Sequence, residues 1–200
     1  MDQYALDCDL MRRCIRLGTA VTEHDDVPIG CVIAKDGEII AEAGNAVRQN
    51  TDPTAHAELL AMKAARGVLN RSTLADCTLY TTVEPCPMCS FAIRQAQVGR
   101  VVFAIGSPIM GGLSKWNVLR DPGLADALPE VFGPVPEVTA GLLGSEAIDA
   151  WRQWNPLVWA AIEHRSIFSE GAESDAGKRI PAPPVKHPVL RSLGKLRDLI

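Results

Sequence analysis

The stretch DPTAHAELLAMKAARGVLNRSTLADCTLYTTVEPCPMCSFAI, residues 52–93, decides most of the fold and chemistry expected of this chain of 200 residues. Its first part is rich in Ala, Leu and Met and follows Thr54, a favourable capping residue. It therefore predicts a helix with His56 and Glu58 in the first turn. CTLYTTV is β-branched and aromatic and predicts a strand. PMCSFAIRQAQ predicts a second helix, because a proline without an N–H is tolerated in a first turn.

The segments on either side of this stretch predict further strands and helices. In PIGCVIAKDGEIIAEAGNAV, an Asp-Gly pair joins two apolar runs, which predicts a β-hairpin. Besides the helix, strand and helix of the central stretch, the sequence predicts strands at 29–34, 38–45, 100–106 and within 136–143. It also predicts a helix in 2–22 and a helix in 145–165 that is interrupted near Asn155 and Pro156. This alternation predicts an α/β protein in which helices cover both faces of a sheet.

The composition is that of one globular domain with an appended tail. Hydrophobic residues make up 47% of the chain and charged residues 22%, which allows a core large enough to bury a site. No apolar run is long enough to cross a bilayer, so we expect no membrane contact and a cytoplasmic protein whose six cysteines are thiols. Residues 1–165 are expected to form the domain, and residues 166–200 a Pro-rich, basic C-terminal extension.

Charge is distributed unevenly along the chain. The net charge is −4, but from Lys178 onward six basic residues stand against one acid, which gives +5 and leaves −9 for residues 1–177. An enzyme that acts on RNA needs a positive surface for the phosphates, so the acidic body argues against a nucleic-acid substrate. The basic tail offers partial compensation, although it suits docking on another subunit equally well.

His56, Cys86 and Cys89 supply the ligand set of a catalytic zinc site, which uses three protein ligands and keeps one position open. Each lies at or just before the start of a predicted helix, where free N–H groups favour a thiolate. Zinc lowers the pKa of a bound water molecule, and the reaction then needs a proton carrier. Glu58, two residues from a ligand, is placed to act as general base and acid. We therefore expect one zinc ion per chain.

The pair of motifs DPTAHAE and EPCPMC closely resembles the cytidine deaminase superfamily, in particular its branch of tRNA adenosine and guanine deaminases. His-x-Glu with Pro-Cys-x-x-Cys is the signature of zinc nucleobase deaminases, and the likeness covers about residues 2–107. It implies a three-layer α/β/α sandwich around a mixed sheet of about five strands, and a homodimer. The site residues that it implies are the zinc ligands His56, Cys86 and Cys89, the proton carrier Glu58, and substrate contacts from Asn45 and the N–H of Ala57.

Three functions fit these observations to different degrees. The acidic body favours hydrolytic removal of an amino group, as ammonia, from a small nucleobase, nucleoside or related amino-heterocycle. The alternative is a tRNA-specific adenosine deaminase that forms inosine at the wobble position. A more distant alternative is a zinc-binding interaction module without activity. Glu58 argues against that module, because a structural zinc site needs no proton carrier.

Overall fold

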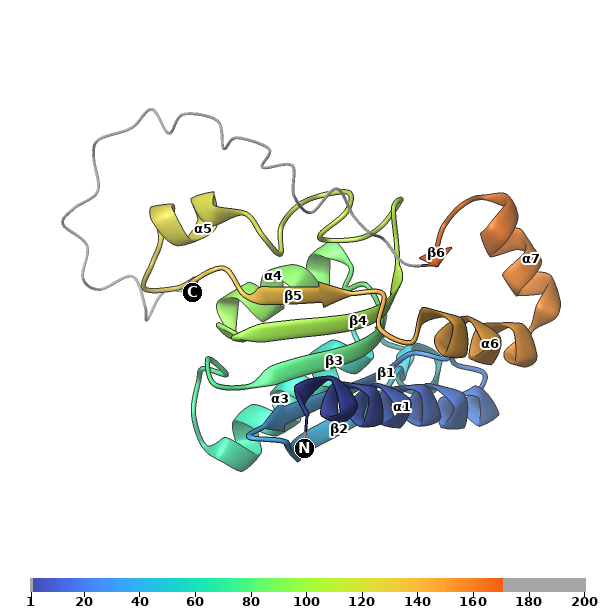
Figure 1. Ribbon diagram of the computed structural model, residues 1–200, viewed down its shortest axis with the longest axis horizontal. Helices are drawn as coiled ribbons and strands as arrows, with labels where there is room; N and C mark the ends of the chain where they lie inside the picture. The colour runs from blue at the N-terminus through green and yellow to red at the C-terminus, as the bar shows by residue number, and fades with distance from the viewer. Residues whose placement is uncertain (1, 171–200) are drawn as a thin grey trace.

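A mixed β-sheet lies at the centre of the protein, and helices pack on both of its faces (Figure 1). The computed structural model describes residues 2–170. The strand order is β2-β1-β3-β4-β5, and a two-residue strand, β6, also pairs with β4. Strands β2, β3, β4 and β5 run in one direction, while β1 is antiparallel to β2 and β3. The predicted sandwich around a mixed sheet of about five strands is confirmed.

The elements follow the predicted order, with a few short additions. The strands are β1 (Gly30–Lys35), β2 (Glu38–Gly44), β3 (Thr78–Val83), β4 (Arg100–Gly106), β5 (Glu137–Ala140) and β6 (Ser169–Glu170). The helices are α1 (Gln3–Val21), the 3₁₀ helix η1 (Thr22–His24), α2 (Val47–Asn50), α3 (Ala57–Leu69), α4 (Pro87–Gln95), α5 (Pro122–Ala127), α6 (Gly144–Trp154) and α7 (Pro156–His164). Within residues 2–170, no helix combines the length and the apolar character needed to cross a membrane.

Side-chain alternation along the strands divides the core into two clusters. Val32 of β1 faces the cluster formed with α1 and α6, whereas its neighbour Ile33 faces the cluster formed with α3 and α4. In β3, Tyr80 likewise faces the first cluster and its neighbour Leu79 the second. Successive strand residues point to opposite faces, so both faces of these strands must be apolar to hold two helical layers.

The hairpin between β1 and β2 forms at the predicted Asp-Gly pair. Asp36 and Gly37 both adopt positive φ angles, 51° and 86°. A two-residue loop with this backbone matches the twist of the flanking strands, and aspartate and glycine are the residues that tolerate it best. The turn thereby sets the pairing of Lys35 with Glu38.

The start of α3 differs from the prediction. The helix begins at Ala57, and His56 stands at its N-cap with extended backbone angles (φ −72°, ψ 146°) and not inside the first turn. Thr54 does not cap the helix. Its hydroxyl donates instead to the carboxylate of Asp52 at 2.7 Å. This local bond competes with capping, a common behaviour of threonine beside aspartate.

The C-terminal part packs on the face of the sheet that α1 also covers. Helices α6 and α7 are separated at Asn155, whose side chain accepts hydrogen bonds from two N–H groups in the first turn of α7, so the predicted interruption is confirmed. Trp151 and Trp159 are buried, and the ring of Phe168 contacts both. The predicted extension, residues 166–200, thus begins within packed structure, and its part from residue 171 lies outside the described residues.

A buried ion pair joins α1 to the first residue of β4, an inner strand of the sheet. The carboxylate of Asp7 is 4% exposed and accepts two hydrogen bonds from Arg100 (2.8 and 2.7 Å). It accepts two more, from the hydroxyl of Tyr80 (2.7 Å) and the side-chain amide of Gln3 (2.8 Å). Burial acts to raise the pKa of Asp7, but these hydrogen bonds outweigh it and hold the pKa below its usual range.

We expect Asp7→Asn to lower the free energy of unfolding by about 3 kcal/mol at pH 7, because it leaves the Arg100 cation in a largely buried place without its partner. The folded-state pKa of Asp7 is depressed, so its contribution is present above about pH 4 and is lost as the pH falls through the folded value. Chemical denaturation at several pH values measures the difference. Asp9→Asn, an exposed change on the same helix, is the control. An equal loss in both variants would contradict the prediction.

Candidate active site

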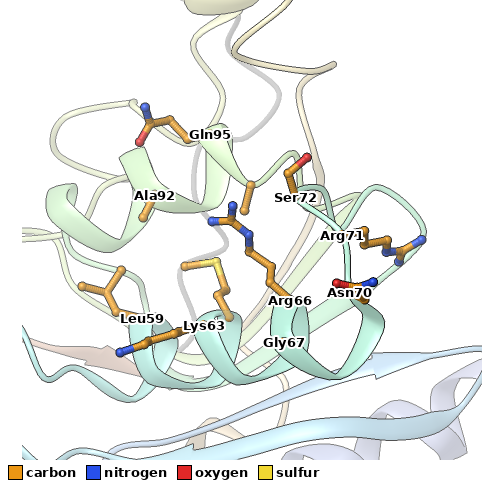
Figure 2. Close-up of a pocket in the computed structure, with 11 residues that line it drawn as sticks. Leu59, Lys63, Arg66, Gly67, Asn70, Arg71, Ser72, Ala92 and Gln95 are labelled. Carbon is orange, nitrogen blue, oxygen red and sulfur yellow. The ribbon is translucent and has the colours of Figure 1, made fainter. Parts of the chain in front are cut away.

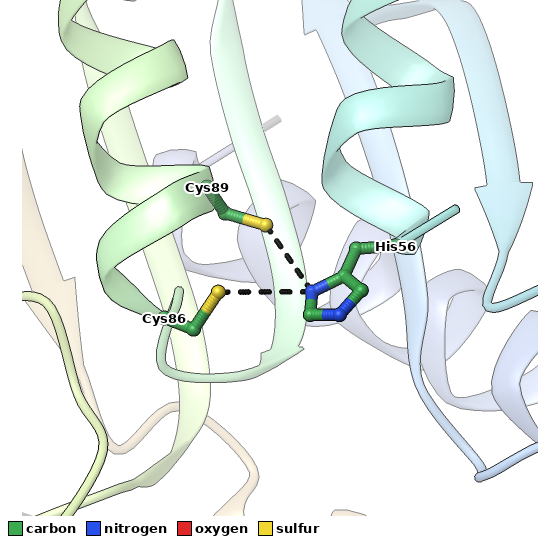
Figure 3. Close-up of side chains that lie close together, drawn as sticks. All are labelled: His56, Cys86 and Cys89. Atoms are coloured by element: carbon green, nitrogen blue, oxygen red, sulfur yellow. Dashed lines mark hydrogen bonds between the residues drawn. The ribbon is translucent and has the colours of Figure 1, made fainter. Parts of the chain in front are cut away.

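Two helix N-termini bring the three predicted zinc ligands together (Figure 3). His56 directly precedes α3, Cys86 directly precedes α4, and Cys89 lies in the first turn of α4. The Nδ1 atom of His56 is 3.4 Å from the sulfur of Cys89 and 3.7 Å from that of Cys86. Their possible ligand atoms all lie within 4.8 Å of one another, and no other such group occurs among residues 2–170.

The electrostatics of this group favour a thiolate. A hydrogen bond from the thiol of Cys89, with a second from His56, lowers the pKa of Cys86 to about 4. The same interaction between the two sulfurs raises the pKa of Cys89, and the contact with Cys86 raises that of His56. Thiolates and neutral imidazole are the forms that ligate zinc, and one histidine with two cysteines is an established catalytic set. The residues therefore fit a zinc ion, as predicted.

Glu58 lies in the first turn of α3 and is 4% exposed. Burial raises the pKa of its carboxyl group to about 7. The Cys89 thiol and the imidazole of His56 are among the groups that influence it, which places the carboxyl beside the ligand group. A carboxyl group with this pKa can both accept and donate a proton near neutral pH. Its role as proton carrier stays a prediction.

Asn45 follows β2 and is held close to the start of α3. The N–H of the next residue, Ala46, donates to the carbonyl of Ala55 at 3.0 Å, and Ala55 directly precedes His56. Asn45 itself is buried, at 4% exposure. Ala57 is the first residue of α3, so its N–H has no acceptor within the helix and is available to a ligand. These placements are compatible with the predicted substrate contacts, which remain predictions.

Asp26 is a residue of this region that the sequence did not single out. Its carboxylate, 1% exposed, accepts a hydrogen bond from the side-chain amide of Asn45 at 2.8 Å. It also accepts from the N–H groups of Arg48 and Gln49, both at 3.1 Å. The Asn45 amide is oriented by these contacts, because its nitrogen must face the carboxylate. In the sequence Asp26 looks no different from Asp25 beside it, whose side chain is exposed.

A separate hollow of about 570 Å³ lies on the outer surface of the α3 and α4 layer (Figure 2). Lys63 and Arg66 of α3, Arg71 of the loop that follows, and Gln95 of α4 contribute polar groups to it. Arg71 pairs with Asp76, whereas Lys63 and Arg66 form no ion pair within the described part of the chain. None of the candidate zinc ligands lines this hollow, so it is distinct from the site above.

Comparison with known proteins is consistent with this geometry. Residues 5–105 match the family model for the zinc-binding region of cytidine and deoxycytidylate deaminases. The tRNA-specific adenosine deaminase of Aquifex aeolicus is 38% identical over 130 residues, which are 64% of this chain and 86% of that protein. A structure solved in studies of A-to-I editing by tRNA:A34 deaminases is 32% identical, with a TM-score of 0.64, and the match covers 71% of this chain and 98% of that one. A structure of guanine deaminase from Nitrosomonas europaea is 26% identical, with a TM-score of 0.58, over 74% of this chain and 83% of that one.

We expect Cys86→Ala and Cys89→Ala each to lose bound metal and to lower the melting temperature, because zinc binding contributes to the stability of the folded state. Elemental analysis after dialysis and thermal unfolding measure the two effects. The control is Cys8→Ala, which removes a buried thiol from α1 outside the ligand group. Full metal content in either ligand variant would show that the ion is held elsewhere.

Proposed function

We propose, on the premise that this chain belongs to the zinc-binding cytidine and deoxycytidylate deaminase family, that it converts adenosine to inosine at the wobble position of tRNA. Membership makes the chain an aminohydrolase, a hydrolase that acts on carbon–nitrogen bonds. The substrate is the proposed part. The observation that carries it is the 38% identity to a tRNA-specific adenosine deaminase, 86% of which is covered.

The chemistry divides among named residues. Water adds to the ring carbon that bears the amino group, and the carbon–nitrogen bond to that amine then breaks. The water oxygen becomes a carbonyl oxygen, one water proton passes to the adjacent ring nitrogen, and the other passes to the amine, which leaves as ammonia. His56, Cys86 and Cys89 would hold the zinc ion, which would lower the pKa of the attacking water. We assign the proton transfer to Glu58, and the binding of the base to Asn45 and the N–H of Ala57. Glu58 is only 4% exposed, so its carboxyl group is largely shielded from bulk water.

Two features offer positive charge to a tRNA despite the acidic body. Lys63 and Arg66 line the hollow beside α3 and α4 and have no acidic partner among residues 2–170. The segment from Lys178 to Ile200 carries a net charge of +5. Cations of this kind bind phosphates with little dependence on the base sequence, and this supports an RNA substrate.

A small nucleobase is the second candidate substrate, and sequence analysis preferred it. The acidic body and the likeness to a guanine deaminase structure favour it. The relatives nevertheless support the tRNA alternative better, because the matches cover 86% of the tRNA-specific adenosine deaminase and 98% of the chain from the tRNA:A34 deaminase studies. A zinc-binding module without activity is the least supported, since the family membership and the buried Glu58 both point to catalysis.

Three further expectations belong to this proposal. A homodimer is expected from the family, and sedimentation of the purified chain measures its mass. A cytoplasmic location is supported by the six cysteines, none of which forms a disulfide in the structure, because reduced cysteines persist in a reducing compartment. Cell fractionation would test this location. The domain boundary expected near residue 165 can be tested with a truncated chain. That chain should end after Glu170, because β6 pairs with β4.

The substrate is tested directly with zinc-loaded protein and an unmodified tRNA transcript that carries adenosine at the wobble position. We expect inosine to form there, and none in a matched transcript with guanosine at that position. Free adenine, guanine and their nucleosides are expected to release no ammonia. Ammonia from a small base, together with an unchanged transcript, would contradict the tRNA proposal and support the second candidate.

Replacing the proposed proton carrier separates catalysis from metal binding. We expect Glu58→Ala to keep zinc and to lose turnover by about 10²–10⁴-fold, the typical contribution of a general acid and base. Inosine formation and elemental analysis on the same samples measure both. Glu38→Ala, an exposed change in β2, is the control. Turnover equal to that of the unmodified protein would rule out the assigned role.

A further inference from the structure

The carboxylate of Glu84 collects hydrogen bonds from a single loop. Glu84 is 3% exposed and stands two residues before the ligand Cys86. It accepts from the N–H groups of Ser107 (2.7 Å), Leu113 (2.9 Å) and Ser114 (2.7 Å), and from the hydroxyl of Ser114 (2.9 Å). Within the described residues it has no basic partner. These donors therefore replace the water that a buried carboxylate loses, and they come from the segment that follows β4.

This segment, residues 107–121, which we call the post-β4 loop, lies in close contact with the zinc-ligand turn. The N–H of Gly112 donates to the carbonyl of Pro85 at 2.8 Å, one peptide bond from Cys86. A side-chain carbon at Gly111 would lie 2.0 Å from the Glu84 carboxylate, and one at Gly112 would lie 2.0 Å from the Ser90 hydroxyl. Neither position has room for a side chain, so the loop follows the turn backbone closely.

A second buried charge holds the other end of the post-β4 loop. Arg94 of α4 is 1% exposed, and its guanidinium donates to the carbonyls of Val118 (3.3 Å), Leu119 (3.4 Å) and Asp121 (2.7 Å). Between these two anchors the loop presents exposed side chains, among them Trp116, which is 59% exposed. The loop is thus held at both ends from elements that also carry or adjoin zinc ligands.

The strand directions place the post-β4 loop at the active-site edge of the sheet. Because β2, β3 and β4 are mutually parallel, the segments after them begin at the same edge. Those segments contain Asn45 and His56, then Cys86 and Cys89, and then the loop itself. Ligands of such sheets bind outside the carboxyl ends of the strands. The loop contributes no candidate zinc ligand, and its position at this end of the strands places it beside the candidate zinc ligands.

We propose that Glu84 is a positioning residue that holds the post-β4 loop as a wall of the substrate site, so that its loss weakens substrate binding while leaving zinc and the proton carrier in place. The tRNA form of this inference rests on the proposed function. With tRNA as substrate, the exposed Trp116 and its neighbour Lys115 offer an aromatic face and a cation to nucleotides beside the target base.

The test compares Glu84→Gln with Glu38→Gln, the same chemical change at an exposed carboxylate. Glutamine at 84 presents an NH₂ group to loop donors that require an acceptor. We expect unchanged zinc content, a KM about tenfold higher for the substrate that the unmodified protein deaminates, and a kcat within about twofold. Ser114→Ala removes only the hydroxyl that donates to Glu84. We expect it to raise KM by less than Glu84→Gln does. The control should match the unmodified protein.

The outcomes separate this inference from the proposed function. If the unmodified protein deaminates only small bases, the tRNA proposal fails, and Glu84 is tested with that base. A fall in kcat at unchanged KM, or loss of zinc from folded Glu84→Gln protein, would overturn the positioning role. If Glu84→Gln does not fold, Ser114→Ala decides alone, and an unchanged KM in that variant rejects the inference.

Discussion

The common direction of β2, β3 and β4 is the constraint on which the rest of the structure depends. It brings the ends of three strands to one edge of the sheet, and therefore the starts of α3 and α4 as well. A histidine before one helix and two cysteines at the start of the other are thereby close enough to bind one metal ion together. Free N–H groups at both helix starts add positive potential, which favours the thiolate.

Buried charged groups determine how the loops around this edge are held. Asp26 orients the amide of Asn45, Glu84 gathers the loop after β4, and Arg94 holds its far end. Each is almost wholly buried, and a buried charge without partners is costly. These hydrogen bonds stabilise the loops in the arrangement that the structure shows. The ion pair of Asp7 and Arg100 has a comparable role at the opposite ends of the strands, where it joins α1 to the start of β4.

Charge and substrate have to be considered together in this protein. Net charge describes the whole chain, whereas a nucleic acid senses only the surface that it touches. The acidic body carries two cations in one hollow that have no acidic partner within residues 2–170, and the C-terminal segment is basic. Both features are compatible with RNA binding, although the net charge of −4 does not reveal them. The net charge of the whole chain favours a small base as substrate, whereas the similar tRNA adenosine deaminases favour a tRNA.

The sequence by itself determined the order of the main elements, the Asp-Gly hairpin and the candidate zinc ligands, because these depend on local backbone preferences and on residue types at short, characteristic spacings. The start of α3 was placed too early, since the bond between Thr54 and Asp52 is not visible in helix propensities. Only the tertiary structure decided that Asp26 is buried while Asp25 is exposed, and that Glu84 meets a loop about thirty residues downstream. Burial and long-range hydrogen bonds arise from how the strands pair and the layers pack, and a single sequence carries no local pattern for either.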